Sequence, residues 1–503
     1  MGWVPCVCAG RNPTGIEWVS FVLQALLYAL IFLIEVAVFA RVQSRTVRQA
    51  SLLIASYVLY LSWQPWFAAV LAASTLVNYG IGRWLRRDGR TFVLWMGILF
   101  NLALLSSFKY LPEVAVQLPF ASLQKFAYLA LPLGISFWTF QAMSYLFDLY
   151  RGEQLDPSLV EFALFMAFFP VTISGPVCRM PEMLPQLRSE KRAGWSDRQS
   201  GLGRIATGVL MMQLAKLLGQ GILAGDGINS GFDQLTHWSG ADVWCLTLGY
   251  GLQLFFDFAG YSHIAIGGAQ VLGFNIPENF ARPFESDSPS AFWTRWHMSL
   301  SFWIRDYVFL PLAMIRREMW WRTLVLVFSM ILFGLWHKVT LLFLIWGCYH
   351  GVLLVLHRQV QQLERRFDWQ PAGRLWNVFS WMVTMLLISL GWIFFRANTL
   401  TEARQMLAAA ASSGDYFSHA LSGSLYLLVA LLAASYTLVL ITAEFFRRYS
   451  TESEVAPRPE ILAVLTRRRW YWVPALYAIV LLGVLLITLT QDATTAQFMY
   501  RSF

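Results

Sequence analysis

Apolar segments of about twenty residues recur along this chain, and they constrain its fold more than any other feature. Such segments extend from Trp18 to Ala40, from Phe92 to Phe108 and from Leu425 to Ala443. A helix of roughly 20 apolar residues crosses the hydrocarbon core of a bilayer and satisfies its own backbone hydrogen bonds there. We therefore predict an all-α fold, a polytopic membrane helical bundle of about 11–13 membrane segments, re-entrant elements included.

The composition supports a membrane location. The chain has 57% hydrophobic and 13% charged residues, whereas a soluble domain carries roughly 25% charged residues. The formal net charge is +9, but most arginines lie between apolar segments, which is typical of topology determinants and lipid headgroup contacts. Membrane lipids are therefore expected partners, and no soluble basic domain remains to bind nucleic acid.

The five cysteines do not predict a metal or redox centre. Cys6 and Cys8 are separated by one residue, which is a poor spacing for zinc. Cys178, Cys245 and Cys348 lie in or beside apolar segments, where free thiols behave as small hydrophobic groups. We expect no bound metal.

The distribution of basic residues predicts the orientation of the chain. Arg41, Arg45 and Arg48 follow the first apolar segment, whereas Arg11 alone precedes it. Because an excess of Lys and Arg marks the cytoplasmic side, the N-terminus is predicted to be extracytoplasmic. The same reasoning over the later loops places the C-terminus on that side too.

Proline and glycine interrupt two apolar segments. Pro132 and Gly134 fall inside a predicted helix at 126–149, where they mark a kink or a break. Segment 162–173 is too short to span and is broken by 169–176, which favours a re-entrant element. The other predicted elements are membrane helices at 50–63, 66–81, 205–223, 243–272, 374–395 and 471–489, basic cytoplasmic loops at 83–90 and 179–204, and an amphipathic helix at 400–411.

Residues 292–358 combine ionisable side chains with tryptophans on both sides of the apolar segment 324–336. Ionisable groups at membrane depth are costly, so they tend to face a bundle interior or a cavity and to have a function. His337 follows this apolar segment directly. A neutral imidazole suits a general base that takes a proton from a sugar hydroxyl as it attacks a thioester carbonyl. A helix-end histidine at the membrane interface is the alternative.

His297 lies on a predicted amphipathic segment that continues to Tyr307. It is a candidate for a second functional histidine or for a structural histidine packed on tryptophan. Arg295 and Arg305 are candidates for pairing with Asp306 and Asp287, or for holding a phosphate of an acyl carrier.

His350 and Asp257 are candidates for supporting roles. His350 follows His337 by thirteen residues, which is about 20 Å if both lie on one continuous helix, and the alternative is a hairpin. Asp257 is a carboxylate inside an apolar segment and needs a partner, for which Arg295 and His263 are nearest. It orients such a partner or forms a structural ion pair.

Several segments together resemble the membrane-bound O-acyltransferase family, in particular the bacterial branch with the alginate O-acetyltransferase membrane subunit and the teichoic acid D-alanyltransferase. Within the branch, 295–303 looks like the D-alanyl enzymes and 391–407 like the polysaccharide acetyltransferases. Two residues depart from the pattern, because the family usually has glycine where Lys338 stands, and the alginate branch often has aspartate where His263 stands. The matching segments are 134–141, 174–176, 257–267, 277–280, 292–307, 334–337, 349–351 and 391–397.

The resemblance implies that His337 is the catalytic histidine and His297 the second functional histidine. It further implies one domain over 1–503, with a family core at 131–404, C-terminal membrane helices at 405–503, and a central funnel or tunnel with a thin floor. Supporting or substrate-binding residues are then Asp257, Arg295, Trp296, Ser299, Arg305, Asp306, Trp336, Lys338 and His350.

The same resemblance implies an O-acetyltransferase of the bacterial inner membrane without a bound cofactor. The expected donor is acetyl-CoA or another acyl thioester such as an acyl carrier protein. The expected acceptor is an envelope or exported polysaccharide, reached directly or through an extracytoplasmic acyltransferase partner. D-alanyl transfer to teichoic acid-type polymers is one alternative. A non-catalytic transporter is another, although the sequence shows no convincing internal repeat.

Overall fold

The computed structural model describes residues 15–112, 115, 126, 129–222, 225–234, 237–368, 373–412, 416–418 and 420–452. Within these residues every regular element is a helix, which confirms the predicted all-α class. Residues 471–489, predicted as the last membrane helix, lie outside the described part.

The chain divides into two compact units: Met1–Ile205 with Tyr261–Trp381, and Ala206–Gly260 with Met382–Phe503. The helices α10 (Trp195–Gln220), α12 (Gly240–Leu272) and α18 (Arg374–Arg396) contribute residues to both units.

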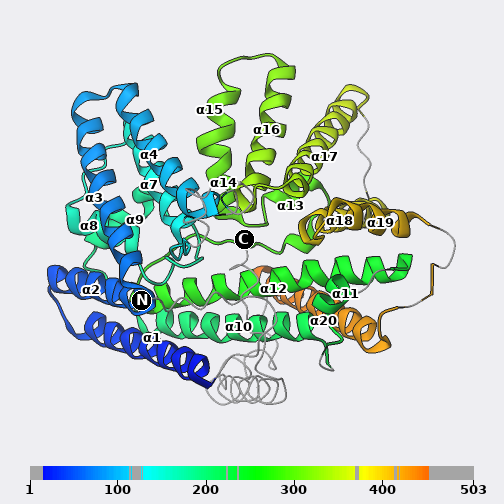
Figure 1. The fold of residues 1–503 in the computed structure, drawn as a ribbon, viewed down its shortest axis with the longest axis horizontal. Helices are drawn as coiled ribbons and strands as arrows, with labels where there is room; N and C mark the ends of the chain where they lie inside the picture. Colours follow the sequence, from blue (N-terminus) through cyan, green and yellow to red (C-terminus); the bar gives the residue numbers. More distant parts are fainter. Residues whose placement is uncertain are drawn as a thin grey trace. The chain divides into compact units, whose positions relative to one another are not determined.

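In the first unit, α3 (Pro65–Asp88) and α7 (Ile135–Tyr150) pack against each other and against both α4 (Thr91–Lys109) and α8 (Leu159–Ala167) (Figure 1). The helix α16 (Met319–His337) packs along α17 (Leu341–Arg366). The other helices that lie wholly in this unit are α1 (Gly15–Arg41), α2 (Arg45–Trp63), α9 (Met180–Arg188), η1 (Pro283–Glu285), α13 (Pro289–Trp293), α14 (Met298–Ile304), η2 (Arg305–Phe309) and α15 (Leu310–Ala313).

In the second unit, Asp242 holds two segments that are distant in sequence. Its carboxylate accepts hydrogen bonds from the backbone N–H groups of Ala420 and Leu421 and from the Tyr426 hydroxyl. Arg396 forms an ion pair with Asp233 at 2.7 Å. The other helices of this unit are α11 (Ile228–Asp233), α19 (Leu400–Ala411) and α20 (Gly423–Glu452).

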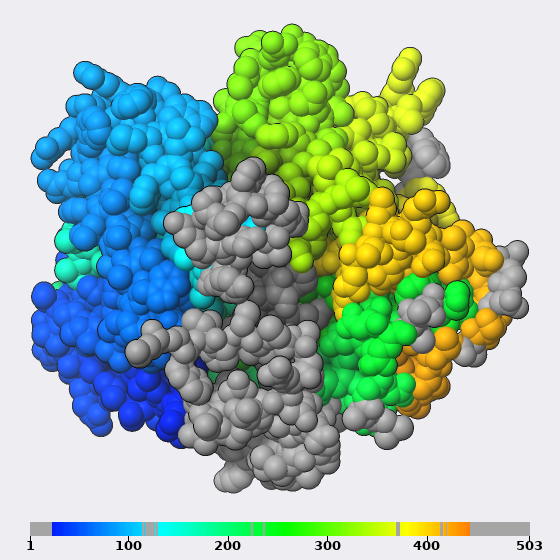
Figure 2. Space-filling view, in the orientation of Figure 1, coloured from blue at the N-terminus to red at the C-terminus, as the bar shows by residue number. Residues whose placement is uncertain are grey.

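Six helices of the described part are long and apolar enough to cross a membrane, which supports the predicted membrane bundle. In the space-filling view, the yellow-green residues of α16 and α17 lie at the surface (Figure 2). Exposed apolar side chains on these two helices include Leu324, Phe328, Val352 and Leu356. The six candidate spans are Leu23–Arg41, Thr91–Lys109, Met319–His337, Leu341–Arg366, Arg374–Arg396 and Gly423–Thr442.

Several predicted boundaries are confirmed. A single residue, Gln64, separates α2 from α3, and Pro65 occupies the first position of α3, where its missing N–H costs no hydrogen bond. The short helix α8 is followed by turns, as the prolines of 169–176 predict. The amphipathic helix at 400–411 begins and ends as predicted. Residues 205–220 and 243–272 lie in α10 and α12, although neither helix is among the six candidate spans.

One predicted loop was wrong, and the structure adds detail to three other predictions. Residues 83–88 are not a loop but the last turns of α3, because cationic side chains favour a helix C-terminus and Gly89 ends the helix in the left-handed conformation. The break predicted at Pro132 and Gly134 is confirmed, because α7 begins at Ile135 directly after Gly134, which has a φ of 68°. Residues 179–204, predicted as a structured loop, contain α9 and the first turns of α10. The predicted segment from His297 to Tyr307 is helical from Met298, where α14 begins, and continues into η2.

Candidate active site

His337 is the last residue of α16, and α17 begins at Leu341, so the two helices form a hairpin. The imidazole is 6% exposed. It stacks on Phe333 with ring centroids 5.8 Å apart, and it meets Trp336 at 4.6 Å. From α17, the Trp346 ring lies perpendicular to the imidazole with ring centroids 6.0 Å apart. Aromatic rings therefore surround the candidate base on several sides.

Glycines allow the two helices of this hairpin to approach closely. A Cβ on Gly347 would lie 2.6 Å from the carbonyl oxygen of Met330 and 2.7 Å from the Cα of Ile331. One turn later, a Cβ on Gly351 would lie 3.0 Å from the Cα of Val327. Small residues at such contacts are typical of helix pairs in membranes, where close packing replaces the hydrophobic effect as the driving force.

His297 lies between α13 and α14 in the left-handed conformation, with a φ of 45°. Neighbouring hydrogen bonds hold this turn. The backbone oxygen of Asn279 accepts a bond from the N–H of Met298, and its side-chain oxygen accepts one from the Ser299 hydroxyl at 2.6 Å. Ser299 in turn accepts a bond from the N–H of Val177 at 3.0 Å. The predicted site residue Ser299 therefore positions the turn that carries His297.

His297 and His337 share two aromatic neighbours. The His297 ring lies 6.3 Å from both Phe333 and Trp336, the rings that also contact His337. His297 is 2% exposed and lies outside the six candidate spans. Burial lowers the pKa of its imidazole to about 3, so this side chain is neutral at neutral pH. The structure thus brings together the two histidines that the sequence singled out.

His350 lies on α17 as the third histidine of the group, and the hairpin alternative is confirmed. Its ring lies 5.2 Å from Trp293 and 4.8 Å from Trp346, and Trp346 also contacts His337. Neither ring nitrogen of His350 has a hydrogen-bond partner among the described residues. A buried polar group without a partner costs about 1–3 kcal/mol, which the aromatic contacts must offset.

The end of α4 contributes two residues that sequence reasoning missed. The Lys109 ammonium lies 4.6 Å from the centroid of the Trp336 ring, on the residue next to His337. The Tyr110 hydroxyl donates to the carbonyl oxygens of Leu335 and Trp336 at 3.3 and 3.2 Å. A lysine at the end of an apolar segment was the available signal, but nothing local indicated which helix it would face. Lys338, the neighbour that the sequence drew attention to, is exposed.

The segment 134–141 approaches the same tryptophans from α7. The Phe140 ring lies 4.5 Å from Trp303 and 5.6 Å from Trp336, and its carbonyl oxygen accepts a bond from the Trp303 indole at 3.0 Å. These contacts connect α7 to α14 and to the end of α16.

A charged cluster surrounds Asp306. Arg305 and Arg179 lie 2.6 and 2.8 Å from its carboxylate, and Arg151 donates to its backbone oxygen. Burial alone would raise the pKa of Asp306, but the hydrogen bonds from Arg305 and Arg179 lower it below its ordinary value. The predicted pairing of Arg305 with Asp306 is confirmed, and Arg179 is an additional partner.

The other predicted residues have separate surroundings. Arg295 faces Glu285 at 3.9 Å rather than Asp306. Trp296 stacks on Phe292 at 5.4 Å and packs on neighbouring aromatic rings. Asp257 lies on α12 in the second compact unit, and its role stays a prediction. No group of three or more metal-ligating side chains occurs among the described residues.

Buried histidines, an aromatic enclosure and six apolar helices define a multi-pass membrane protein with a candidate acid–base site. The sequence model of MBOAT, the membrane-bound O-acyltransferase family, matches residues 120–396. The chain therefore belongs to the membrane-bound O-acyltransferase family and is an acyltransferase.

Three relatives illustrate the range of similar proteins. The chain is 34% identical over 387 residues to the probable alginate O-acetylase AlgI of Pseudomonas aeruginosa, which covers 73% of this chain and 71% of the relative. It is 30% identical over 389 residues to the peptidoglycan O-acetyltransferase of Helicobacter pylori, and the match covers 71% of this chain and 72% of the relative. It is 31% identical over 277 residues to the teichoic acid D-alanyltransferase of Bacillus subtilis, and the match covers 52% of this chain and 68% of the relative.

Proposed function

We propose that this protein is an O-acetyltransferase of the bacterial inner membrane that acts on an envelope or exported polysaccharide, with His337 as the general base. The main observation in support is that His337 and His297 are buried together against Phe333 and Trp336. The names of the Pseudomonas and Helicobacter relatives support acetyl as the group transferred.

The proposed reaction moves one proton from the acceptor hydroxyl to His337 and then from His337 to the leaving sulfur. An imidazole nitrogen of His337 takes the proton of an acceptor hydroxyl as its oxygen attacks the carbonyl carbon of the donor thioester. A new carbon–oxygen bond forms and the carbon–sulfur bond breaks. The leaving sulfur then takes the proton from the imidazolium, so the base is regenerated.

Lys109 and His297 have supporting roles in this proposal. The Lys109 ammonium is held beside the histidines by its contact with Trp336. A fixed positive charge in a site without water stabilises negative charge that develops on the carbonyl oxygen. His297 is neutral, so it can position a hydroxyl or the thioester through a hydrogen bond without adding charge.

The direction of transfer follows from the predicted topology. A cytoplasmic donor, acetyl-CoA or an acyl carrier protein, would reach the site from one side, and the acceptor or an extracytoplasmic transferase from the other. The tunnel that this route needs stays a prediction, because the cavity at the ends of α1 and α9 is lined by none of the candidate active-site residues.

D-alanyl transfer is the second candidate. It is favoured by the similarity to the Bacillus subtilis teichoic acid D-alanyltransferase and by segment 295–303. The acetyl reading has broader support, because the P. aeruginosa relative covers 73% of the chain and the B. subtilis relative 52%.

The test uses the full chain in proteoliposomes with radiolabelled acetyl-CoA and an acceptor polysaccharide. We expect His337→Ala to lower acetyl transfer by roughly 10²–10⁴-fold, the contribution of one acid–base group. His237→Ala is the matched control, because His237 is an exposed histidine of the second unit. Size-exclusion chromatography and thermal unfolding confirm that both variants fold. Full acetyl transfer by a folded His337→Ala variant would remove the proposed mechanism, and transfer from a D-alanyl carrier protein alone would favour the second candidate.

A further inference from the structure

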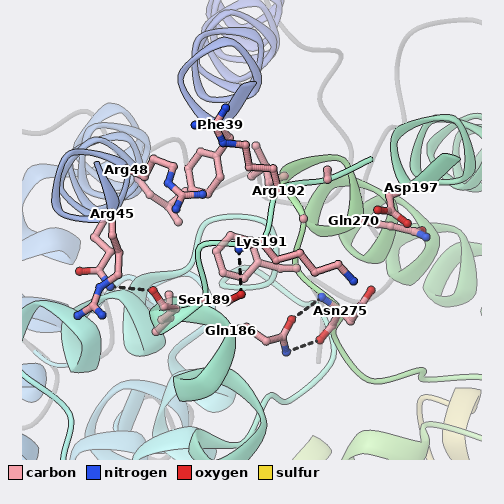
Figure 3. A pocket seen from close by; sticks show the side chains of 17 residues that line it. Phe39, Arg45, Arg48, Gln186, Ser189, Lys191, Arg192, Asp197, Gln270 and Asn275 are labelled. Atoms are coloured by element: carbon pink, nitrogen blue, oxygen red, sulfur yellow. Dashed lines mark hydrogen bonds between the residues drawn. The ribbon is translucent and has the colours of Figure 1, made fainter. Parts of the chain in front are cut away.

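A cavity of about 260 Å³ lies in the first compact unit, where the ends of α1, α9 and α12 meet the start of α2 (Figure 3). None of the candidate active-site residues lines it. The polar side chains that face the cavity include Arg45, Arg48, Lys191, Arg192, Asp197 and Gln270.

Positive charge dominates this cavity, because four of its lining side chains are basic and one is acidic. Two of the basic groups have partners in the described part of the chain. Arg45 lies 3.4 Å from Glu161, and Arg192 donates to the carbonyl oxygens of Ala40 and Val42. The single acid, Asp197, accepts a hydrogen bond from a backbone N–H.

Arg48 is a buried cation of the cavity lining that has no counter-ion among the described residues. It is 5% exposed, it has no ion pair among the described residues, and its Nε has no hydrogen-bond partner there. Its guanidinium lies 5.7 Å from the Phe39 ring, which supplies only a weak cation–π contact. Burial, and after it the neighbouring Arg192, lower the pKa of Arg48, although Glu190 opposes this effect. An anion in the cavity would offset the cost of burying this charge.

Two further side chains complete the lining. Lys191 also has no ion pair in the described residues, and it is exposed enough to approach an anion from the solvent side. The side-chain oxygen of Gln270 is buried without a hydrogen-bond partner there. It can accept a bond from a hydroxyl group. The cavity thus offers positive charge for a phosphate and an acceptor for a neighbouring hydroxyl.

The size and position of the cavity indicate the kind of ligand. Sites for whole drug-sized molecules occupy about 300–1,000 Å³, so about 260 Å³ fits a headgroup better than an entire nucleotide thioester. The helix α1 ends at this cavity, and Leu26, Leu30 and Leu33 on one face of it are exposed. Acyl chains can lie along that apolar face while the headgroup enters the cavity.

We propose that this cavity binds the phosphate group of an anionic phospholipid, with Arg48 and Lys191 contacting the phosphate and Gln270 accepting a bond from a headgroup hydroxyl. Basic pockets beside membrane helices are suited to such headgroups. A phosphatidylglycerol headgroup carries both the phosphodiester and the hydroxyls that this lining requires. The proposal does not depend on the proposed acetyl transfer.

The test measures lipid binding to the delipidated full chain by native mass spectrometry. The probes are phosphatidylglycerol, phosphatidylcholine and, as a soluble phosphate source, inorganic diphosphate. We expect phosphatidylglycerol to bind at least about tenfold more tightly than phosphatidylcholine, and Arg48→Gln and Lys191→Gln each to lower its affinity about tenfold. Arg322→Gln is the matched control, because Arg322 is an exposed arginine at a helix start outside the cavity.

The outcomes separate the alternatives. Equal phosphatidylglycerol affinity in the wild type, Arg48→Gln and Lys191→Gln would overturn the proposal. Diphosphate binding that depends on Arg48, without any preference for phosphatidylglycerol, would overturn the lipid assignment in favour of a soluble phosphate ligand. If Arg48→Gln does not fold, Lys191→Gln decides, since Lys191 is exposed.

Discussion

Replacing Gly347 by alanine tests whether the close approach of α16 and α17 positions the candidate base. Gly347 contacts the backbone of Met330 and Ile331, two helical turns before His337, and it is adjacent to Trp346, whose ring meets His337. The substitution adds one methyl group and no charge. Its effect on activity must therefore arise from a change in helix position.

The magnitude follows from the distances. A carbon atom and a carbonyl oxygen approach to about 3.3 Å in ordinary weak contacts, whereas the new Cβ would lie 2.6 Å from the Met330 oxygen. Both clashing groups are backbone, so no side chain can rotate away, and the helices must separate by roughly 0.7 Å, the difference between these contact distances. Overpacking of this kind costs about 1–3 kcal/mol, less the 0.5–1 kcal/mol that alanine gains over glycine in a helix. A displacement near 1 Å at a catalytic group lowers the rate by roughly 100-fold.

The assay compares acetyl transfer and thermal unfolding of Gly347→Ala with those of Gly80→Ala. Gly80 is also a helical glycine of the first unit, but a Cβ there would meet nothing within 4 Å. We expect Gly347→Ala to unfold at a lower temperature and to lose about 10–100-fold in transfer rate, whereas Gly80→Ala keeps the wild-type rate. Wild-type stability and activity in both variants would refute the view that this contact fixes His337.

Two further predictions address charge. Lys109→Met keeps most of the side-chain length but removes the ammonium beside Trp336. The rate of acetyl transfer should therefore fall at least about tenfold, while the unfolding temperature changes little. An unchanged kcat/KM would exclude an electrostatic role for Lys109. Glu161 is buried, yet hydrogen bonds from Arg188 and then from Ser158 lower its pKa from 4.5 to about 2. Between pH 2 and pH 4.5 the folded state therefore binds fewer protons than the unfolded state. The contribution of the Glu161 carboxylate to the free energy of unfolding, about 3 kcal/mol at most, is therefore present above pH 5 and is lost as the pH falls toward 2. The stability difference between wild type and Glu161→Gln should shrink from pH 7 to pH 3. A constant difference would contradict this account.

The sequence predicted well those elements that local signals define. The helix at 400–411 has an apolar period together with Thr399, whose side chain caps the N-terminus by accepting a bond from Glu402 N–H. Long apolar runs likewise predicted α1, α4 and α16. The wrong prediction at 83–88 has a local cause too, because a run of basic residues is typical of a cytoplasmic loop but also stabilises a helix C-terminus.

Contacts between distant segments were not predictable in the same way. Nothing near His297 in the sequence indicates a left-handed turn, since the hydrogen bonds that hold it come from Asn279 and, through Ser299, from Val177. Lys109 and Arg179 acquire their roles only because α4 and the segment before α9 pack against the ends of other helices. The histidines were identified in advance because an ionisable residue beside an apolar run is unusual, but their neighbours had no comparable signal.

The candidate active site and the basic cavity both lie in the first compact unit, but their electrostatic surroundings differ. Around His337 and His297 the neighbouring side chains are mostly aromatic rings, and the Lys109 ammonium lies beside Trp336, which is the setting of the proton exchange that we propose. Around Arg48, several cations are held close together with too little acid to balance them, which favours binding of a permanent anion. Substitutions at the first site should therefore change the rate of transfer, and substitutions at the second should change which lipids stay bound, so the two sets of effects are separable by measurement.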